Sequence, residues 1–123
     1  MLTKSKKKYL FAIYMLGENG GSVKSTLVSD LLGVSKASTV KMTQRLIEDG
    51  YIIKEPYREI RLTELGRQEA DRLFRPSVVL QDFLENRVGV EKSKAREDSI
   101  IMAAELSAES LEKLVTFAEK DVS

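Results

Sequence analysis

The sequence contains no cysteine and no histidine among its 123 residues. Without cysteine the chain can form neither a disulfide framework nor a redox motif, so the expected location is a reducing cytoplasm. Without histidine it lacks the side chain that most often acts as a general base near neutral pH, and it also lacks a thiol nucleophile. These absences predict that the protein is not an enzyme.

Long apolar segments and phosphate-binding loops are absent from the sequence as well. No apolar run approaches the length that crosses a bilayer, so we expect no membrane partner. The apolar segment at residues 9–16 follows four lysines, but residues 17–20 read Gly-Glu-Asn-Gly and offer no small-residue cleavage site of a signal peptide. Gly20 and Gly21 lack the spacing and the following Lys-Ser pair of a phosphate loop.

Charge is distributed unevenly along the chain. Residues 1–62 hold 11 basic and 6 acidic side chains, whereas residues 63–123 hold 9 basic and 13 acidic ones. A basic first half suits binding to a polyanion, and an acidic second half suits a different task. Such a division also arises by chance, so by itself it favours no function.

Helical periodicity is clear twice in the first 32 residues. Apolar residues at three- and four-residue spacing predict a helix over residues 5–16. A second helix is predicted over residues 25–32, with Ser25 as its N-cap. Four apolar side chains of this second helix are expected to face inward: Leu27, Val28, Leu31 and Leu32.

A third helix follows a glycine turn. Gly33 is expected to make the turn, because glycine tolerates left-handed backbone angles at no steric cost. Ser35 is a good N-cap, and the helix that it starts is predicted to run to Asp49 and to end at Gly50. Two helices joined by a short glycine turn, the second rich in Ser, Thr and Lys, have the order of a helix-turn-helix.

Two short strands are predicted after the third helix. Residues 51–55 read as one strand, residues 56–59 as the tip and residues 60–62 as the return strand. The sequence therefore predicts a mainly α (α+β) fold, a winged helix-turn-helix that places one helix in the DNA major groove. We expect this DNA-binding domain to span residues 1–74 and a C-terminal helical dimerisation domain to span residues 75–123.

Three further helices are predicted in the second half. One begins at Thr63, and its apolar period continues past Pro76. Because proline removes a backbone donor and disfavours helix at the preceding residue, we expect a kink or break near Arg75. The last two helices are predicted at residues 91–106 and 108–120.

Periodicity divides the third helix into two faces. One face is expected to pack on the first two helices: Thr39, Met42, Thr43 and Leu46. The opposite face is expected to meet double-stranded DNA, and its residues are Lys36, Ala37, Val40, Lys41 and Gln44. Lysine offers charge to phosphate or guanine, glutamine can pair with adenine, and a small apolar group can meet a thymine methyl.

Other DNA contacts are predicted at the ends of the motif. Ser35 and Ser38 lie at the start of the third helix, where hydroxyl and backbone donors can hold a phosphate. Tyr57 and Arg58 project from the tip and would meet the DNA backbone or minor groove. Two alternatives stay open, because Val40 also reads as a partly buried rim residue and the tip as an ordinary solvated hairpin.

Several stretches of the chain resemble those of a known family: Ile13-Tyr14-Met15-Leu16, Lys41-Met42-Thr43-Gln44-Arg45-Leu46, Glu55-Pro56-Tyr57-Arg58, Leu62-Thr63-Glu64-Leu65-Gly66 and Phe83-Leu84. On these stretches, residues 9–84 resemble the manganese- and iron-dependent repressors of the diphtheria-toxin-repressor class, in particular the short manganese transport regulators. The resemblance implies a homodimeric, DNA-binding transcriptional repressor whose C-terminal helices form the dimer interface. Two apolar segments fit that interface or, alternatively, close the monomer core: residues 100–104 and the stripe Leu111, Leu114, Val115 and Phe117.

The resemblance also implies activation by manganese or iron, but the positions of the family's ligands hold Lys8, Phe11, Ser77, Ile100, Ala103 and Ala104. Mn²⁺ and Fe²⁺ sites need carboxylate and imidazole donors, and a lysine ammonium group repels a divalent cation. We therefore expect no metal cofactor. A shifted site built from carboxylates alone stays open, although solvated helix-face charges are the preferred interpretation of its candidates: Glu97, Asp98 and Glu105.

Two functions remain after these observations. The leading one is a sequence-specific DNA-binding transcriptional regulator that works without metal, and the alternative is a winged-helix protein-interaction module without DNA binding. The cations Lys36, Lys41 and Arg45 favour the first. Two roles stay open for the apolar residues at the ligand positions. Either their packing holds the two domains in one orientation without metal, or the apolar cleft that they form accepts a small apolar effector.

Overall fold

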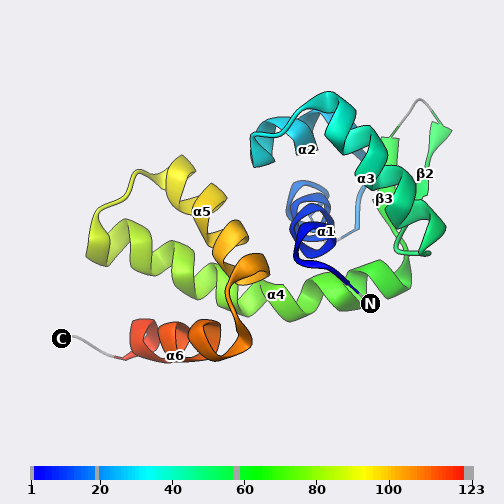
Figure 1. Ribbon diagram of the computed structural model, residues 1–123. Helices are drawn as coiled ribbons and strands as arrows, with labels where there is room; N and C mark the ends of the chain where they lie inside the picture. Colours follow the sequence, from blue (N-terminus) through cyan, green and yellow to red (C-terminus); the bar gives the residue numbers. More distant parts are fainter. Residues whose placement is uncertain (1, 19, 57–58, 121–123) are drawn as a thin grey trace. The chain divides into compact units, whose positions relative to one another are not determined.

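The computed structural model describes residues 2–18, 20–56 and 59–120 (Figure 1). The chain divides into two compact units, Met1–Arg72 and Leu73–Ser123. The domain boundary expected from the sequence, after residue 74, stays a prediction.

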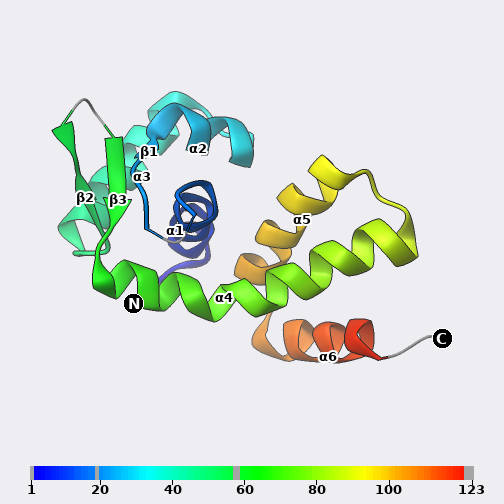
Figure 2. The same ribbon diagram turned by 180° about the vertical axis from the view of Figure 1, so that it is seen from behind.

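The N-terminal unit holds a small sheet and most of the helices expected in a winged helix-turn-helix. Its elements are α1 (Lys4–Leu16), β1 (Val23–Lys24), α2 (Ser25–Leu32), α3 (Lys36–Glu48), β2 (Ile52–Lys54), β3 (Glu59–Leu62) and the first turns of α4 (Glu64–Phe83). The strands are antiparallel, with β3 between β1 and β2 (Figure 2). In this sheet Val23 pairs with Ile60, and Ile52 pairs with Leu62. The sequence did not predict β1, because a two-residue strand carries no periodic pattern.

The core of the N-terminal unit is centred on α1. Its residues 9–14 are all buried, and the helix packs against α2, α3 and β3. Leu46 of α3, Ile52 of β2 and Ile60 of β3 complete this core with exposed fractions of 3% or less. The predicted recognition helix and the wing therefore pack on the same apolar core.

The start of α2 differs from the sequence prediction in two respects. Ser25 is the first helical residue rather than the N-cap, because Lys24 is extended at the end of β1 and occupies the cap position. Leu27 is 48% exposed instead of facing inward, while Val28 beside it is fully buried. The turn that follows is confirmed, with Gly33 in the left-handed region at φ 66°.

The wing and α4 meet at a glycine. Thr63 accepts a hydrogen bond from the Gly66 N–H at 3.1 Å and donates one to the Gly50 carbonyl at 2.7 Å. A Cβ atom on Gly66 would lie 2.0 Å from the Tyr51 carbonyl oxygen, so only glycine allows this close approach. These contacts fix the first turn of α4 against the base of the wing.

The C-terminal unit is helical. After α4 come the π-helical turn η2 (Leu84–Val88), α5 (Lys92–Glu105) and α6 (Ala108–Glu119). Of the kink or break predicted near Arg75, the break is wrong, because α4 continues through Pro76, and the kink stays a prediction. Proline removes one helical donor, and the buried Leu73 and Leu80 hold the turns before and after it.

Aromatic and charged side chains connect the end of α6 to α4 and η2. The rings of Phe83 and Phe117 meet edge to face with centroids 6.2 Å apart, and the Arg87 guanidinium lies 5.0 and 5.7 Å from these two ring centroids. Arg75 and Glu119 form an ion pair. None of the described helices is long and apolar enough to cross a membrane.

Candidate nucleic-acid interface

A buried pair of hydroxyl groups links α2 to α3. Ser29 donates a hydrogen bond to the Thr39 hydroxyl at 2.8 Å, and Thr39 donates in turn to the Ser35 carbonyl at 3.1 Å. Both side chains are buried. Because an unpaired buried hydroxyl costs about 1–3 kcal/mol, this chain of hydrogen bonds favours one arrangement of the helix-turn-helix.

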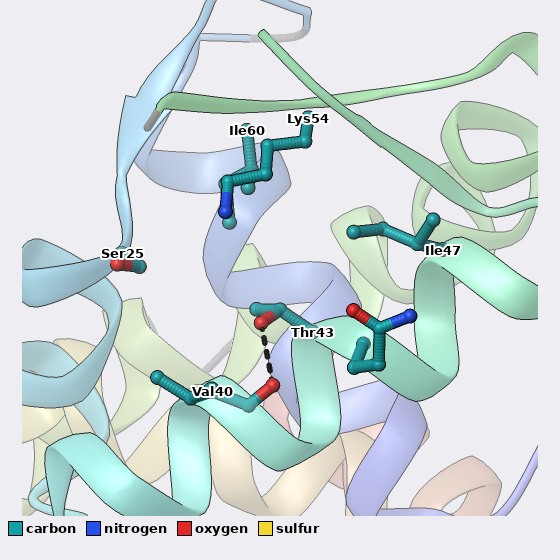
Figure 3. A pocket seen from close by; sticks show the side chains of 7 residues that line it. Ser25, Val40, Thr43, Ile47, Lys54 and Ile60 are labelled. Carbon is teal, nitrogen blue, oxygen red and sulfur yellow. Dashed lines mark hydrogen bonds between the residues drawn. The ribbon is translucent and has the colours of Figure 1, made fainter. Parts of the chain in front are cut away.

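The inward face of α3 agrees with the predicted periodicity. Thr39, Thr43 and Leu46 are buried, and Met42 is half-buried. Thr43 satisfies its hydroxyl within the helix by donating to the Val40 carbonyl at 3.0 Å (Figure 3). The polar atoms on this face are therefore paired inside the helix-turn-helix.

The opposite face of α3 is open to solvent, and we call it the recognition face. Its residues are all exposed in the structure: Lys36, Ala37, Val40, Lys41 and Gln44. Val40 is 63% exposed, which excludes the alternative that it is a partly buried rim residue of this chain. Gln44 donates to Glu48 at 3.3 Å, one turn further along the helix. That these side chains touch DNA stays a prediction.

The hydroxyl groups at the start of α3 cap the helix. Ser35 accepts the Ser38 N–H at 3.0 Å and donates its own proton to the Ser38 hydroxyl at 2.9 Å. The N-cap predicted at Ser35 is confirmed. Tyr57 and Arg58, the two contacts predicted at the wing tip, lie outside the described residues.

A cavity of about 310 Å³ lies between the wing and one flank of α3. Its lining residues come from α2, α3, β2 and β3: Ser25, Val40, Thr43, Gln44, Ile47, Lys54 and Ile60. Figure 3 shows the ammonium group of Lys54 reaching from β2 into this cavity. We call it the wing-side cavity.

A second cavity, of about 330 Å³, lies on the flank of α3 that faces α1. It is lined by Ser5, Lys8, Tyr9, Val34, Ser38, Lys41, Met42 and Arg45. Three of these eight residues are cations, and among the described residues that line it none is acidic. We call it the α1-side cavity. Lys54 and Arg45 are not among the predicted DNA contacts, because Lys54 lies on β2 and Arg45 lies outside the predicted outward face of α3.

Two polar contacts stabilise the N-terminal unit away from the outer surface of α3. Lys6 pairs with Asp49 at 2.6 Å, which connects α1 to the end of α3. The Tyr14 hydroxyl donates to Asp71 at 2.7 Å. Burial and this hydrogen bond to a carboxylate raise the pKa of Tyr14 to about 12, while the nearby Arg67 acts in the opposite direction.

Residues 1–60 match the family model described as iron dependent repressor, N-terminal DNA binding domain. The chain is 32% identical over 120 residues to an HTH-type transcriptional regulator of Methanocaldococcus jannaschii, covering 97% of this chain and 96% of that protein. It is 34% identical over 124 residues to the HTH-type transcriptional regulator MntR of Bacillus subtilis, covering 98% of this chain and 87% of that protein. The chain belongs to the DtxR/MntR repressor family.

Solved structures share the fold of this DtxR/MntR member. IdeR of T. acidophilum matches with a TM-score of 0.69 at 22% identity, and the manganese regulator SloR matches with 0.65 at 23% identity. The matches cover 94% and 91% of this chain, but only 54% and 52% of those chains, so the chain spans about half their length. Family members are transcriptional regulators that bind double-stranded DNA and form dimers. The chain is thus a helix-turn-helix transcriptional regulator that binds DNA.

The positions at which the resemblance places the family's metal ligands hold side chains that do not suit Mn²⁺ or Fe²⁺, and the absence of a metal cofactor stays a prediction. Phe11, Ile100, Ala103 and Ala104 are buried and have no donor atom, and the Ser77 hydroxyl donates to the Phe74 carbonyl at 2.8 Å. The remaining position is the cation Lys8. Among the described residues no group of three or more Asp or Glu side chains is arranged to hold a metal ion. The side chains at these six positions include none of the carboxylates and imidazoles that these ions prefer.

Proposed function

We propose that this chain is a homodimeric transcriptional repressor that selects its DNA sequence without a metal cofactor. The observation that carries the proposal is the recognition face of α3, where Lys36, Val40, Lys41 and Gln44 are all exposed on one helix. The proposed site of action is the cytoplasm, and no catalytic step is part of the proposal.

The chemistry of the recognition face divides the work between position and sequence. Lys36 and Lys41 suit phosphate or guanine, and their charge supplies affinity for any duplex. Gln44 suits the adenine edge, and Val40 suits a thymine methyl. A solvated valine on a charged helix loses nothing by being covered, so contact with a methyl group would contribute apolar burial.

The proposed homodimer is supported by the apolar surface of the C-terminal unit. Within the described chain no residue of α6 is buried. Leu111, Leu114 and Val115 are half-buried, and Phe117 is 53% exposed. We assign this surface to a second copy of the chain, since family members form dimers. Two copies related by a twofold axis would present two recognition helices to a pseudo-palindromic operator.

Independence from metal is supported by the replacement of ligands with apolar groups. Phe11 is 0% and Ile100 is 1% exposed, so these side chains contribute packing where a ligand would contribute a charge. Packing of this kind needs no ion to hold it. The alternative is that a small apolar effector binds at these positions. The duplex selection described next would then recover a sequence only after that effector is added.

Duplex selection by the purified protein tests the proposal. We expect it to recover one pseudo-palindromic sequence in the presence of a chelator, with the same sequence and affinity after manganese is added. Lys41→Glu should abolish this selection, and Lys92→Glu on α5, which makes the same change in net charge, should not. Strict dependence on manganese would refute independence from metal. Absence of salt-sensitive binding to any duplex would instead favour the protein-interaction module.

A further inference from the structure

The recognition helix has a cavity on each flank. Val40, Gln44 and Ile47 follow one another at three- and four-residue spacing and line the wing-side cavity. Ser38, Lys41 and Arg45 follow the same spacing on the other flank and line the α1-side cavity. Because residues three and four apart share a helix face, the two cavities border the recognition face on opposite sides.

The α1-side cavity has the chemistry of an anion site. Lys41 and Arg45 are one helical turn apart on α3, where like charges repel each other. Ser5 on α1 and Ser38 on α3 add hydroxyl groups. An anion placed between α1 and α3 would relieve the repulsion and accept hydrogen bonds from these donors.

The wing-side cavity offers one cation and a hydroxyl group. Lys54 is exposed on β2, and its ammonium group points into the cavity from the wing. Ser25 lies on the opposite side, in the first turn of α2 (Figure 3). Thr43 at the floor already donates its proton to Val40, so Lys54 is the principal donor available to an anion here.

The arrangement matches the two sides of a major groove. A helix that lies in the groove has one sugar-phosphate strand on each side, and both strands carry one negative charge per nucleotide. We propose that Arg45 and Lys54 each bind a backbone phosphate, Arg45 from the α1-side cavity and Lys54 from the wing-side cavity. This inference rests on DNA binding by the recognition face, and it identifies the two residues that fix the depth and tilt of α3.

Phosphate contacts have a signature that base contacts lack. They set register and affinity but read no sequence, so losing one weakens binding to every duplex equally. Each lost contact also lowers the slope of log K against log salt concentration by about 0.9. Arg45 and Lys54 should therefore differ from Gln44, whose loss changes which duplex is preferred.

Binding of the full chain to its selected duplex, measured across a range of salt concentrations, tests this assignment. We expect Arg45→Ala and Lys54→Ala each to weaken binding at least tenfold at low salt, to lower the salt slope by about 0.9 per subunit, and to leave the selected sequence unchanged. The controls Arg72→Ala and Lys92→Ala remove the same charge from exposed positions that line neither cavity. They should change affinity less than threefold.

Duplexes with neutral methylphosphonate linkages locate the contacts. At the linkage that each residue binds, neutralisation should weaken the wild-type protein but should not further weaken the corresponding alanine variant. Equal sensitivity of wild type and variant at every linkage would overturn the assignment. Alanine variants whose duplex affinity matches that of the controls, or that select a new sequence, would overturn it as well. Saturable binding of inorganic phosphate that leaves duplex affinity unchanged at constant ionic strength would assign the cavities to a free anion. If the wild-type protein binds no duplex, DNA binding itself fails.

Discussion

The two units of the molecule bury different side chains. The N-terminal unit buries large ones from helices and sheet together, among them Phe11, Leu46 and Ile52. The described part of the C-terminal unit buries as many alanines as larger apolar groups, namely Ala95, Ala103 and Ala104 beside Leu73, Leu80 and Ile100. Among the described residues both units expose four large apolar groups: Leu27, Val40, Ile53 and Leu65 in the N-terminal unit, and Phe74, Val78, Val88 and Phe117 in the C-terminal unit.

The outer surfaces of α3 and α6 suit different tasks. In the N-terminal unit the outer surface of α3 is charged and polar, and its exposed apolar residues are Ala37 and Val40. In the C-terminal unit α6 exposes Phe117 and leaves Leu111, Leu114 and Val115 half-buried, and covering these apolar groups requires a second apolar surface. A charged surface suits nucleic acid, and a stripe of incompletely buried apolar groups suits a second copy of the chain.

The largest expected effect concerns the N-terminal core. Leu46 is 0% exposed, so Leu46→Ala should lower the free energy of unfolding by about 2–5 kcal/mol through lost burial and a cavity. Leu65→Ala, the same substitution at a residue 45% exposed, should cost less than about 1 kcal/mol. Urea denaturation measures both, and equal losses would remove the distinction between core and surface in this unit.

The second effect concerns association through α6. Phe117→Glu replaces a half-exposed apolar side chain of α6 with a charge and should weaken dimerisation about 100-fold, measured by sedimentation equilibrium. Thr116→Glu, on the same helix but at an exposed polar position, should leave the association constant within threefold of wild type. Circular dichroism checks that both variants remain helical. A Phe117→Glu protein that dimerises as well as wild type would place the interface elsewhere.

The third effect separates sequence reading from charge. Gln44→Ala should cost about 1–3 kcal/mol on the selected duplex and relax the preference at one base pair of each half-site. Lys41→Ala should weaken all duplexes and lower the salt slope, with the selected sequence retained. Parallel selection with both variants makes the measurement. An unchanged preference after Gln44→Ala would assign the readout to other residues.

The smallest effect is on the contact between Tyr14 and Asp71. The pKa of Tyr14 rises from 10.0 to about 12 on folding, so the folded chain retains the phenol proton more tightly than the unfolded chain. Stability from this group is therefore present below pH 10 and is lost as the pH rises towards 12. Tyr14→Phe should cost about 1 kcal/mol near neutral pH and should show a shallower decline between pH 10 and 12 in urea denaturation. Identical pH profiles for the two proteins would contradict this role.

Much of the N-terminal unit could be predicted from local pattern. The three helices, the Gly33 turn, the Ser35 cap and the inward set of α3 all follow from periodicity and cap chemistry, which act within a few residues. Leu27 was predicted wrongly because an eight-residue helix with apolar residues at 27, 28, 31 and 32 fits more than one inward direction. The break predicted as one alternative near Arg75 was wrong because burial on both sides of Pro76 outweighs one lost hydrogen bond.

The features that the sequence did not reveal depend on contacts between distant segments. The strand β1 exists through its pairing with β3, whose partner residues lie 35 and 37 positions further along the chain. The Tyr14–Asp71 hydrogen bond joins residues separated by 57 positions. The α1-side cavity likewise brings Lys8 together with Arg45, and nothing in either local pattern marks the pair.

The most direct test of metal-free DNA binding by the recognition face is NMR mapping of the full chain with its selected duplex in the presence of a chelator. The account predicts that the largest amide shifts fall on Lys36, Val40, Lys41 and Gln44, without added metal. Shifts that leave α3 unchanged, or that appear only after manganese is supplied, would contradict it.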